Sequence, residues 1–257
     1  MRRFCLALLP LLALFAVAAP APATAQSLPD MTTLDEAQRN ALHGEIRAYL
    51  LENPEIIMEA IQVLEQQRRD AERFAERGLV DGHREALFNN PHDWVGGNPE
   101  GPITLVEFSD YRCGFCKRAH PIIAELLERS PDVRLVVKEF PILGPDSVTA
   151  GRMAMAAHDL EPEKYKALND ALMTYRGNLT EAAAYRIANE VGYDIAALKA
   201  HAGSDEIDAR LRQNYELASA LGVQGTPSFV LENQILRGFL PLEDMLARVA
   251  QARQTSN

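Results

Sequence analysis

The stretch FSDYRCGFCKRAHP, residues 108–121, contains two cysteines, Cys113 and Cys116, separated by two residues. An apolar run at 103–108 precedes the pair, and an amphipathic run at about 114–129 follows it, so the pair falls at a predicted strand-to-helix junction. At a helix N-terminus, free N–H groups and the helix dipole stabilise a thiolate. We therefore expect Cys113 to be the attacking sulfur and Cys116 to resolve the mixed disulfide by thiol–disulfide exchange.

Other uses of a cysteine pair fit the sequence less well. A closed zinc site needs four ligands, and Cys116 with His120 supplies two on one helix face with no evident fourth nearby. A c-type haem needs histidine directly after the second cysteine, where this chain has Lys117. A purely structural disulfide across two residues closes a very short loop and would contribute little by chain entropy. Redox chemistry is the favoured interpretation.

The first residues predict export. Arg2 and Arg3 are followed by an apolar run and then by small residues ending at Ala25, which is typical of a secretory signal peptide cleaved after Ala25. We therefore expect a periplasmic protein with two cysteines, too few for a disulfide framework. The formal charge of −10 becomes more negative when both arginines leave, which argues against binding to nucleic acid or an anionic membrane surface.

The remaining chain divides into two predicted parts. Residues 26–92 are expected to be an N-terminal helical segment that oligomerises. Residues 93–257 are expected to be a catalytic domain that opens with the strand at 103–108 and carries a helical insertion at about 146–221. Within the domain we expect further strands at 133–140, 228–231 and 234–237, inserted helices starting near Pro162, Thr180, Asp194 and Ser204, and a last helix from Pro241.

The N-terminal segment has helix signals of its own. Thr33 with Glu36 suggests a capping box, and Asn53-Pro54 an N-cap followed by proline at the first helical position. Gly78 is expected to end the second helix. Apolar residues, including Ile57, Ile61, Leu64 and Phe74, follow one face of that helix and predict burial against another surface.

Two motifs resemble a known family. VEFSDYRCGFCKRAHP, followed downstream by GVQGTPSFV, resembles the thioredoxin-fold Dsb proteins of the bacterial envelope, and in particular the DsbA-like branch with a helical block inserted. YLLENPEIIMEAIQ, near the N-terminus, is similar to the ScsC-type and Com1-like members. The resemblance implies an α/β thioredoxin-like fold with an inserted helical block, preceded by an N-terminal helical segment. It also implies a homo-oligomer, with a trimer favoured. We expect no bound metal and no cofactor.

The resemblance also assigns site residues. Cys113 and Cys116 match the redox pair. Pro227 matches a cis-proline that lies against the sulfurs, and Thr226 would offer its backbone to a substrate strand. Glu107 matches a buried acid beneath the site, and Lys138 matches the basic partner of that acid.

The residues between the cysteines favour one branch of function. Phe115 stands where DsbA has histidine, so Cys113 should be less acidic and the disulfide less oxidising than in DsbA. We therefore favour an oligomeric disulfide isomerase or reductase that acts on misfolded envelope proteins and is served by a membrane redox partner protein. The alternatives are a monomeric DsbA-like dithiol oxidase, or a copper-binding envelope protein that uses the thiols as soft ligands.

Overall fold

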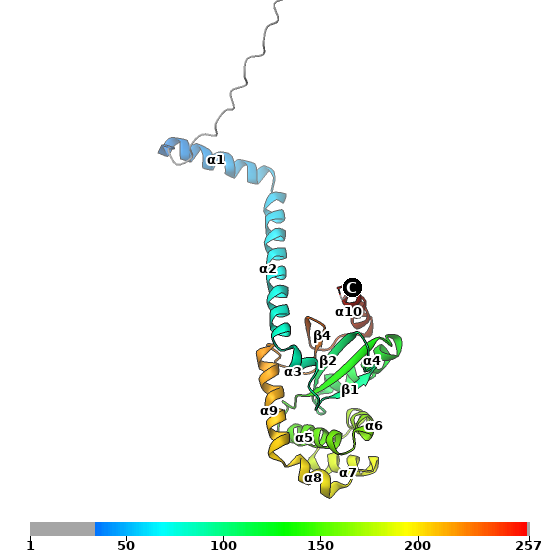
Figure 1. The fold of residues 1–257 in the computed structure, drawn as a ribbon. Coiled ribbons are helices and arrows are strands. Elements are labelled where there is room, and N and C mark those ends of the chain that lie inside the picture. Colours follow the sequence, from blue (N-terminus) through cyan, green and yellow to red (C-terminus); the bar gives the residue numbers. More distant parts are fainter. Residues whose placement is uncertain (1–33, 256–257) are drawn as a thin grey trace, which may run out of the picture. The chain divides into compact units, whose positions relative to one another are not determined.

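The structure, a computed structural model, describes residues 34–255, which form ten helices and five strands (Figure 1). The expected signal peptide and Thr33 lie outside these residues. The described residues divide into two compact units after Gln62. None of the helices within 34–255 is long and apolar enough to cross a membrane.

The described part of the first unit is helical. Helix α1 spans Glu36–Glu52 and buries none of its side chains. Its N-cap is Asp35, whose carboxylate accepts from the backbone N–H of Gln38 at 2.8 Å, while the Gln38 side chain accepts from Asp35 N at 3.0 Å. The capping box is therefore not the expected Thr33–Glu36 pair, because the helix begins with Asp35 as its cap.

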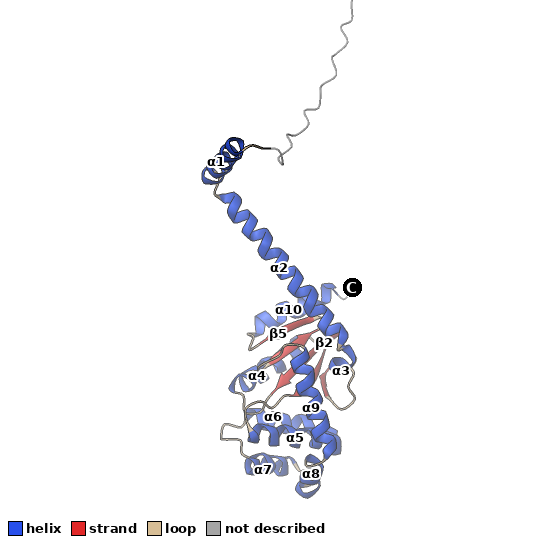
Figure 2. Cartoon of the chain, turned by 90° about the vertical axis from the view of Figure 1, so that its left-hand side faces the viewer, coloured by secondary structure: helices blue, strands red, loops and turns tan. Residues whose placement is uncertain are grey.

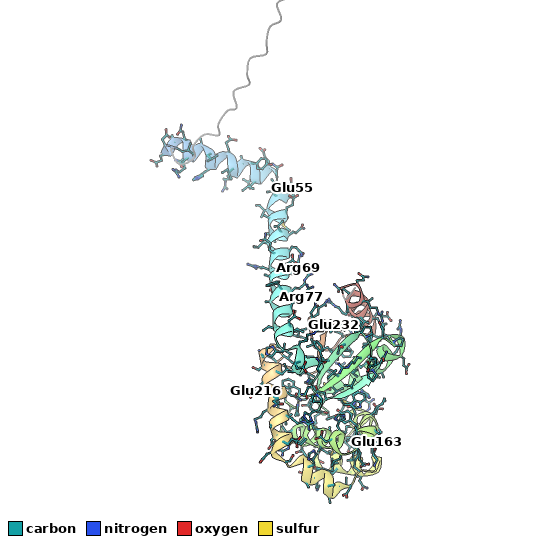
Figure 3. All side chains as sticks on the ribbon, viewed as in Figure 1. Glu55, Arg69, Arg77, Glu163, Glu216 and Glu232 are labelled. Carbon is teal, nitrogen blue, oxygen red and sulfur yellow. The ribbon has the colours of Figure 1, made fainter. Side chains whose placement is uncertain are left out.

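Helix α2 spans Glu55–Gly82 and runs past Gly78, where we expected it to end. Glycine weakens a helix by only about 1 kcal/mol, and here the last turns are held by Val80, which is fully buried in the core of the second unit. Earlier in α2, side chains such as Arg69 and Arg77 point away from the helix axis (Figure 3). Helix α3, Arg84–Phe88, adds two buried residues to the same core.

The second unit is built on a five-stranded mixed sheet in the order β1-β3-β2-β4-β5. Central strands β2 and β3 are parallel, and every other pairing is antiparallel. The strands are β1 Trp94–Gly97, β2 Ile103–Ser109, β3 Val133–Glu139, β4 Ser228–Leu231 and β5 Gln234–Arg237.

Strand β1 was not predicted, because its glycines look like breakers. The Trp94 ring lies over Gly96 so closely that a Cβ there would come within 2.2 Å of it, and Gly97 has a φ of +65°. Glycine inside a strand often marks such a close approach. The sequence Gly96-Gly97 is thus part of an edge strand paired with β3 rather than a linker.

The sheet has a different set of helices on each face. Apolar residues of β2, β3 and β4 pack against α4 (Gly114–Arg129) and α10 (Leu242–Thr255) on one side. Alternate residues pack on the other side against Val80, α3 and α9 (Asp205–Ala220). Because side chains alternate along a strand, each polar residue in β2 or β3 belongs to one face or the other.

The inserted helices gather at one end of the sheet in both ribbon views (Figures 1 and 2). Thr180, Asp194 and Ser204 are N-caps, each with its side chain accepting from a backbone N–H of the first turn, which confirms the predicted starts. The helices are α5 Pro145–Leu160, α6 Pro162–Thr174, α7 Glu181–Val191 and α8 Ile195–Ala202, followed by α9.

Candidate active site

Cys113 is the N-cap of α4, and its sulfur is held by groups from two parts of the chain. Its Sγ accepts from the backbone N–H of Cys116 at 3.5 Å and lies 3.1 Å from the carbonyl oxygen of Thr226, to which the thiol donates. Cys113 is 6% exposed and Cys116 is fully buried, and both are free thiols. The structure therefore brings together the two cysteines and the loop that precedes β4.

The two thiols differ sharply in acidity. A hydrogen bond from the Cys116 thiol lowers the pKa of Cys113 to about 5, against the opposing effect of burial. A bond from the Thr226 side chain and bonds from the backbone of Cys116 and Phe115 act in the same direction. The same Cys113–Cys116 interaction raises the pKa of Cys116, and burial and the nearby Glu107 raise it further. The site therefore favours a thiolate at Cys113 and a thiol at Cys116.

Thr226 and Pro227 are joined by a cis peptide bond, as the resemblance implied. Their loop lines an open surface hollow of about 350 Å³ together with residues at the end of β5. The hollow is lined by Gly222, Gln224, Gly225, Thr226, Pro227, Ser228, Arg237 and Gly238.

Glu107 lies in β2 on the face that carries α4, and it is 6% exposed. Burial raises the pKa of this carboxyl to about 7, against the lowering effect of the nearby Ser109 side chain, and Cys113 raises it further by repulsion. Glu107 in turn raises the pKa of Cys116. The carboxyl is therefore close enough to the thiols to affect their charge.

The expected pairing of Glu107 with Lys138 is wrong. In the parallel β2–β3 register Glu107 lies opposite Val137, and Lys138 lies opposite Phe108, so the two side chains point to opposite faces. Lys138 is fully buried and pairs with Asp93, and it also donates to the carbonyl oxygen of Ala86. Glu107 therefore has no lysine partner from β3.

Asp110 is a site residue that the sequence analysis missed. Its buried carboxylate accepts from the backbone N–H of Arg112 at 2.8 Å and from Ser147 Oγ at 2.9 Å through Oδ1. Through Oδ2 it accepts from the backbone N–H groups of Ile142 and Leu143 at 2.9 and 3.1 Å. One side chain thus joins the active-site turn to the start of the inserted helices. An acid three residues before a redox cysteine was the available signal.

Glu139 is the second missed residue. Its Oε1 accepts from the hydroxyls of Tyr111 at 2.8 Å and Tyr165 at 2.9 Å, and the two hydroxyls are 3.3 Å apart. Burial raises the pKa of Glu139 to about 8, although both tyrosine bonds lower it. Tyr111 is buried at 2% exposure. Its hydroxyl needs a buried partner, and Glu139 supplies one.

Phe115 forms an exposed apolar surface beside Cys113. It is 53% exposed, and the Arg118 guanidinium lies over its ring at 4.2 Å and over the Phe239 ring at 5.2 Å. His120, in the same helix, lies 3.1 Å from Asp170. Within residues 34–255, no three histidine, cysteine or carboxylate side chains are grouped as a metal site.

Comparison with known families agrees with this geometry. Residues 104–250 match the DSBA-like thioredoxin domain, and residues 38–71 match the N-terminal domain of the copper resistance protein ScsC. The chain spans about a quarter of the length of the curated relatives it matches, such as the Na⁺/H⁺ antiporter NhaA 3 of Salinispora tropica, which is 29% identical over 162 residues (62% of this chain and 24% of the antiporter).

Solved structures cover more of the chain. A thioredoxin-like oxidoreductase from Silicibacter pomeroyi DSS-3 is 43% identical, with a TM-score of 0.64, and covers 66% of this chain and 98% of its own. A periplasmic thioredoxin-like protein from Salmonella enterica serovar Typhimurium is 30% identical, with a TM-score of 0.61. The match covers 66% of this chain and 94% of the Salmonella chain. Proteus mirabilis ScsC in a transitional conformation is 27% identical, with a TM-score of 0.64. The match covers 88% of this chain and 100% of the ScsC chain.

The match to the DSBA-like domain extends over more than half of the sequence and contains Cys113, Cys116 and the Thr226–Pro227 loop. The chain therefore belongs to the DSBA-like thioredoxin domain family.

Proposed function

We propose that this protein is an exported thiol–disulfide oxidoreductase that acts on the disulfides of periplasmic proteins. The proposal rests above all on Cys113, a helix N-cap whose pKa is lowered to about 5 and whose sulfur lies 3.1 Å from Thr226 O. A thiolate is the nucleophile in disulfide exchange, so this sulfur is ready to react at neutral pH.

The reduction of a substrate disulfide takes two exchanges. The Cys113 thiolate attacks one substrate sulfur, an S–S bond forms between them, and the other substrate sulfur leaves as a thiolate. Cys116 then gives its proton to the Glu107 carboxylate and attacks Cys113. The Cys113–Cys116 bond forms, the bond to the substrate breaks, and the substrate leaves with two reduced sulfurs while the protein is oxidised. In this scheme Glu107, whose pKa is about 7, is the proton acceptor for Cys116.

Two surfaces beside Cys113 suit an extended polypeptide. The hollow is lined in part by Thr226, whose carbonyl oxygen lies 3.1 Å from the Cys113 sulfur, and the Thr226 backbone is proposed to pair with a substrate strand. The exposed Phe115 ring offers an apolar contact. An unfolded or misfolded chain has both free backbone groups and exposed apolar side chains, so such chains are the proposed substrates.

The N-terminal helices support an oligomeric isomerase. Helix α1 buries no side chain, and α2 buries only Val80. Large apolar side chains on both helices are 44–80% exposed, among them Ile46, Tyr49, Leu51, Ile57, Met58, Ile61, Val63, Leu64 and Phe74. Exposed apolar surface of this extent marks an interaction site, and copies of the same chain are the proposed occupant. Several active sites around one substrate make a second attack effectively intramolecular, which favours reshuffling.

The redox function can be tested by trapping. The Cys116→Ala variant of residues 26–257 is purified and mixed with a disulfide substrate. Mass spectrometry then detects mixed disulfides between the variant and the substrate. We expect a covalent adduct at Cys113, and none after Cys113→Ala. Failure of Cys113 to form an adduct above the background of a solvent-exposed thiol would remove the proposal.

A monomeric DsbA-like oxidase is the second candidate, supported by the membership of residues 104–250 in the DSBA-like family. Alkylation with a mass tag in whole cells distinguishes the two functions. An isomerase or reductase served by a membrane redox partner is held with both thiols reduced, whereas an oxidase is held as the disulfide. Copper binding is the third candidate, supported by the ScsC N-terminal match, and metal analysis of the reduced protein tests it.

A further inference from the structure

A second buried acid lies on the same face of the sheet as Glu107. In the β2–β3 register Glu107 is opposite Val137 and Ser109 is opposite Glu139, so the two glutamates are diagonal neighbours on adjacent strands. Both are at least 94% buried. Like charges this close in a buried site repel each other, so their titrations are coupled.

The position of Glu139 is fixed by its hydrogen bonds. Tyr111, two residues before Cys113, and Tyr165, from α6, both donate to Oε1. Because both bonds go to one oxygen, Oε2 remains free to carry a proton while Oε1 accepts. The carboxyl can therefore be neutral without losing either bond.

The fixed positive charges near Glu139 are paired with other acids. Arg210, from α9, donates to the carbonyl oxygen of His92 beside the cavity and pairs with Asp159. The neighbour of Glu139 in the chain, Lys138, points to the opposite face and pairs with Asp93. The two tyrosines have raised pKa values, mainly through burial, and so stay neutral. The other ionisable groups facing Glu139 or the small cavity beside it are Glu107 and Asp110 from β2 and the turn after it, His158 from α5, and His92 and Asp93 from the segment before β1. Burial lowers the pKa of His158, which also keeps that ring neutral.

We propose that Glu139 is a positioning residue of the redox site. Tyr111 and Tyr165 hold its carboxyl beside Glu107. Glu139 keeps its proton there, while Glu107 exchanges a proton with Cys116. The inference rests on the proposed function, because Glu107 is the proton acceptor only in that scheme. A neutral Glu139 leaves Glu107 free to ionise. A charged Glu139 would oppose the second negative charge that Glu107 carries.

The acids keep this order over a defined pH range. The pKa of Glu107 is about 7 and that of Glu139 is about 8. The pKa of Glu139 is raised first by burial, and then by repulsion from Asp110 and from Glu107. Between these two values Glu107 is mainly a carboxylate and Glu139 mainly an acid. Above the higher value both are charged, and the Cys113 thiolate is then the third negative group in the site.

The coupling can be measured without any redox reaction. Carbon-13-labelled glutamate carboxyls in protein of residues 26–257 are titrated by NMR. We expect Glu107→Gln to lower the pKa of Glu139, because the variant removes one of the negative charges that raise it. Tyr165→Phe removes a donor to Oε1 and should raise the pKa of Glu139, while Tyr111 still donates to the same oxygen.

The matched control is Glu216→Gln, which removes an exposed carboxyl on α9 (Figure 3) and should move neither titration. If Glu139 titrates at the same pH in wild type, Glu107→Gln and Tyr165→Phe proteins, the inference is overturned. If the Glu107 variant does not fold, the direction of the Tyr165→Phe shift still decides.

A second readout links Glu139 to the thiols. The equilibrium constant with glutathione is compared for wild type and Glu139→Gln, below the Glu107 pKa of about 7 and above the Glu139 pKa of about 8. We expect equal values in the lower range. In the upper range we expect the variant to be several-fold more oxidising, because it lacks the charge that destabilises the reduced thiolate.

A difference that is the same at every pH would show that Glu139 acts only through packing, and would overturn the inference. Absence of any exchange with glutathione would instead remove the proposed function, and the NMR titration would still decide whether the two acids are coupled.

Discussion

Cys113 and Thr226 are 113 positions apart in the sequence, yet the sulfur of one lies 3.1 Å from the carbonyl oxygen of the other. Helix α4 supplies the thiol, and the loop before β4 supplies the oxygen. The contact joins the parts of the chain that carry the two sequence motifs, and it leaves Cys116 one turn deeper and fully buried.

The acidity of Cys113 gives the first prediction. In reduced wild-type protein, thiolate absorbance should rise with a midpoint near pH 5. Cys116→Ala should raise that midpoint, because the Cys116 thiol is the largest cause of the lowered pKa, but the midpoint should stay below the free value of about 8.5. A midpoint at the free value in the variant would show that Thr226 and the helix N-terminus contribute nothing.

Phe115→His should make the disulfide more oxidising. An imidazole can donate to the Cys113 thiolate, which stabilises the reduced form and raises the potential. A change of about 30 mV corresponds to ~1.4 kcal/mol, the size of one charge-assisted hydrogen bond. Equilibration with glutathione measures it, with Phe115→Leu as a control that removes the ring and adds no donor. An unchanged potential in the histidine variant would show that Phe115 does not set the redox poise.

Ile57→Glu together with Ile61→Glu should reduce the oligomer to smaller species and slow the reshuffling of a scrambled substrate. Both side chains are 44–48% exposed on one face of α2 and are the proposed interface. Light scattering gives the mass, and refolding of the scrambled substrate gives the activity. Gln62→Glu adds a charge to the same helix without removing an apolar side chain, and it should retain the oligomer. A wild-type monomer would favour the oxidase alternative.

The stability of the reduced protein should depend on its buried acids. Burial raises the pKa of Glu139 to about 8, whereas a glutamate in an unfolded chain titrates near 4.3. Between these values the folded state binds more protons, so this group stabilises the fold at low pH and its contribution is lost as pH rises. Cys113 acts in the opposite direction, since its pKa is lowered.

The effect of the acid is therefore isolated by comparing wild type with Glu139→Gln in urea unfolding. From about pH 5 to about pH 9, wild type should lose roughly 4 kcal/mol relative to the variant. Parallel pH profiles for the two proteins would contradict the assignment.

Asp93→Asn should destabilise the fold by roughly 3–5 kcal/mol, because it leaves the buried Lys138 ammonium without its counter-charge. Asp93→Asn combined with Lys138→Met should recover much of the loss. Urea unfolding measures both. Neither should change the Cys113 titration, since Lys138 is on the opposite face from Glu107. A single variant as stable as wild type would show that the pair is not needed.

The sequence predicted the elements that have strong local signals. The strands at 228–231 and 234–237, the helix at 114–129 and the N-caps Thr180, Asp194 and Ser204 agree with the structure, because period, caps and turns are encoded by neighbouring residues. The edge strand β1 was missed because its glycines are required by packing between Trp94 and Gly96, which no local pattern reveals.

The site was predictable only in part, for a similar reason. Cys113 and Cys116 identify themselves by spacing, but the pairing of acids and bases depends on which face each strand residue occupies. A shift by one residue reverses the face, so LVVKEF presents either Lys138 or Glu139 to the redox site. In the observed register Glu139 lies on the same face as Glu107. Lys138 lies on the other face and pairs with Asp93, a residue outside both motifs.

The carboxylate of Asp110 has a consequence for how this fold could be shortened. It takes one hydrogen bond from Ser147 in α5 and two from the backbone just before that helix. A smaller protein made by deleting α5 to α9 and joining β3 to β4 would leave an acid in the interior with most of its donors gone. Residue 110 would have to be exchanged for an apolar one in the same step, so the inserted helices are not a separable module.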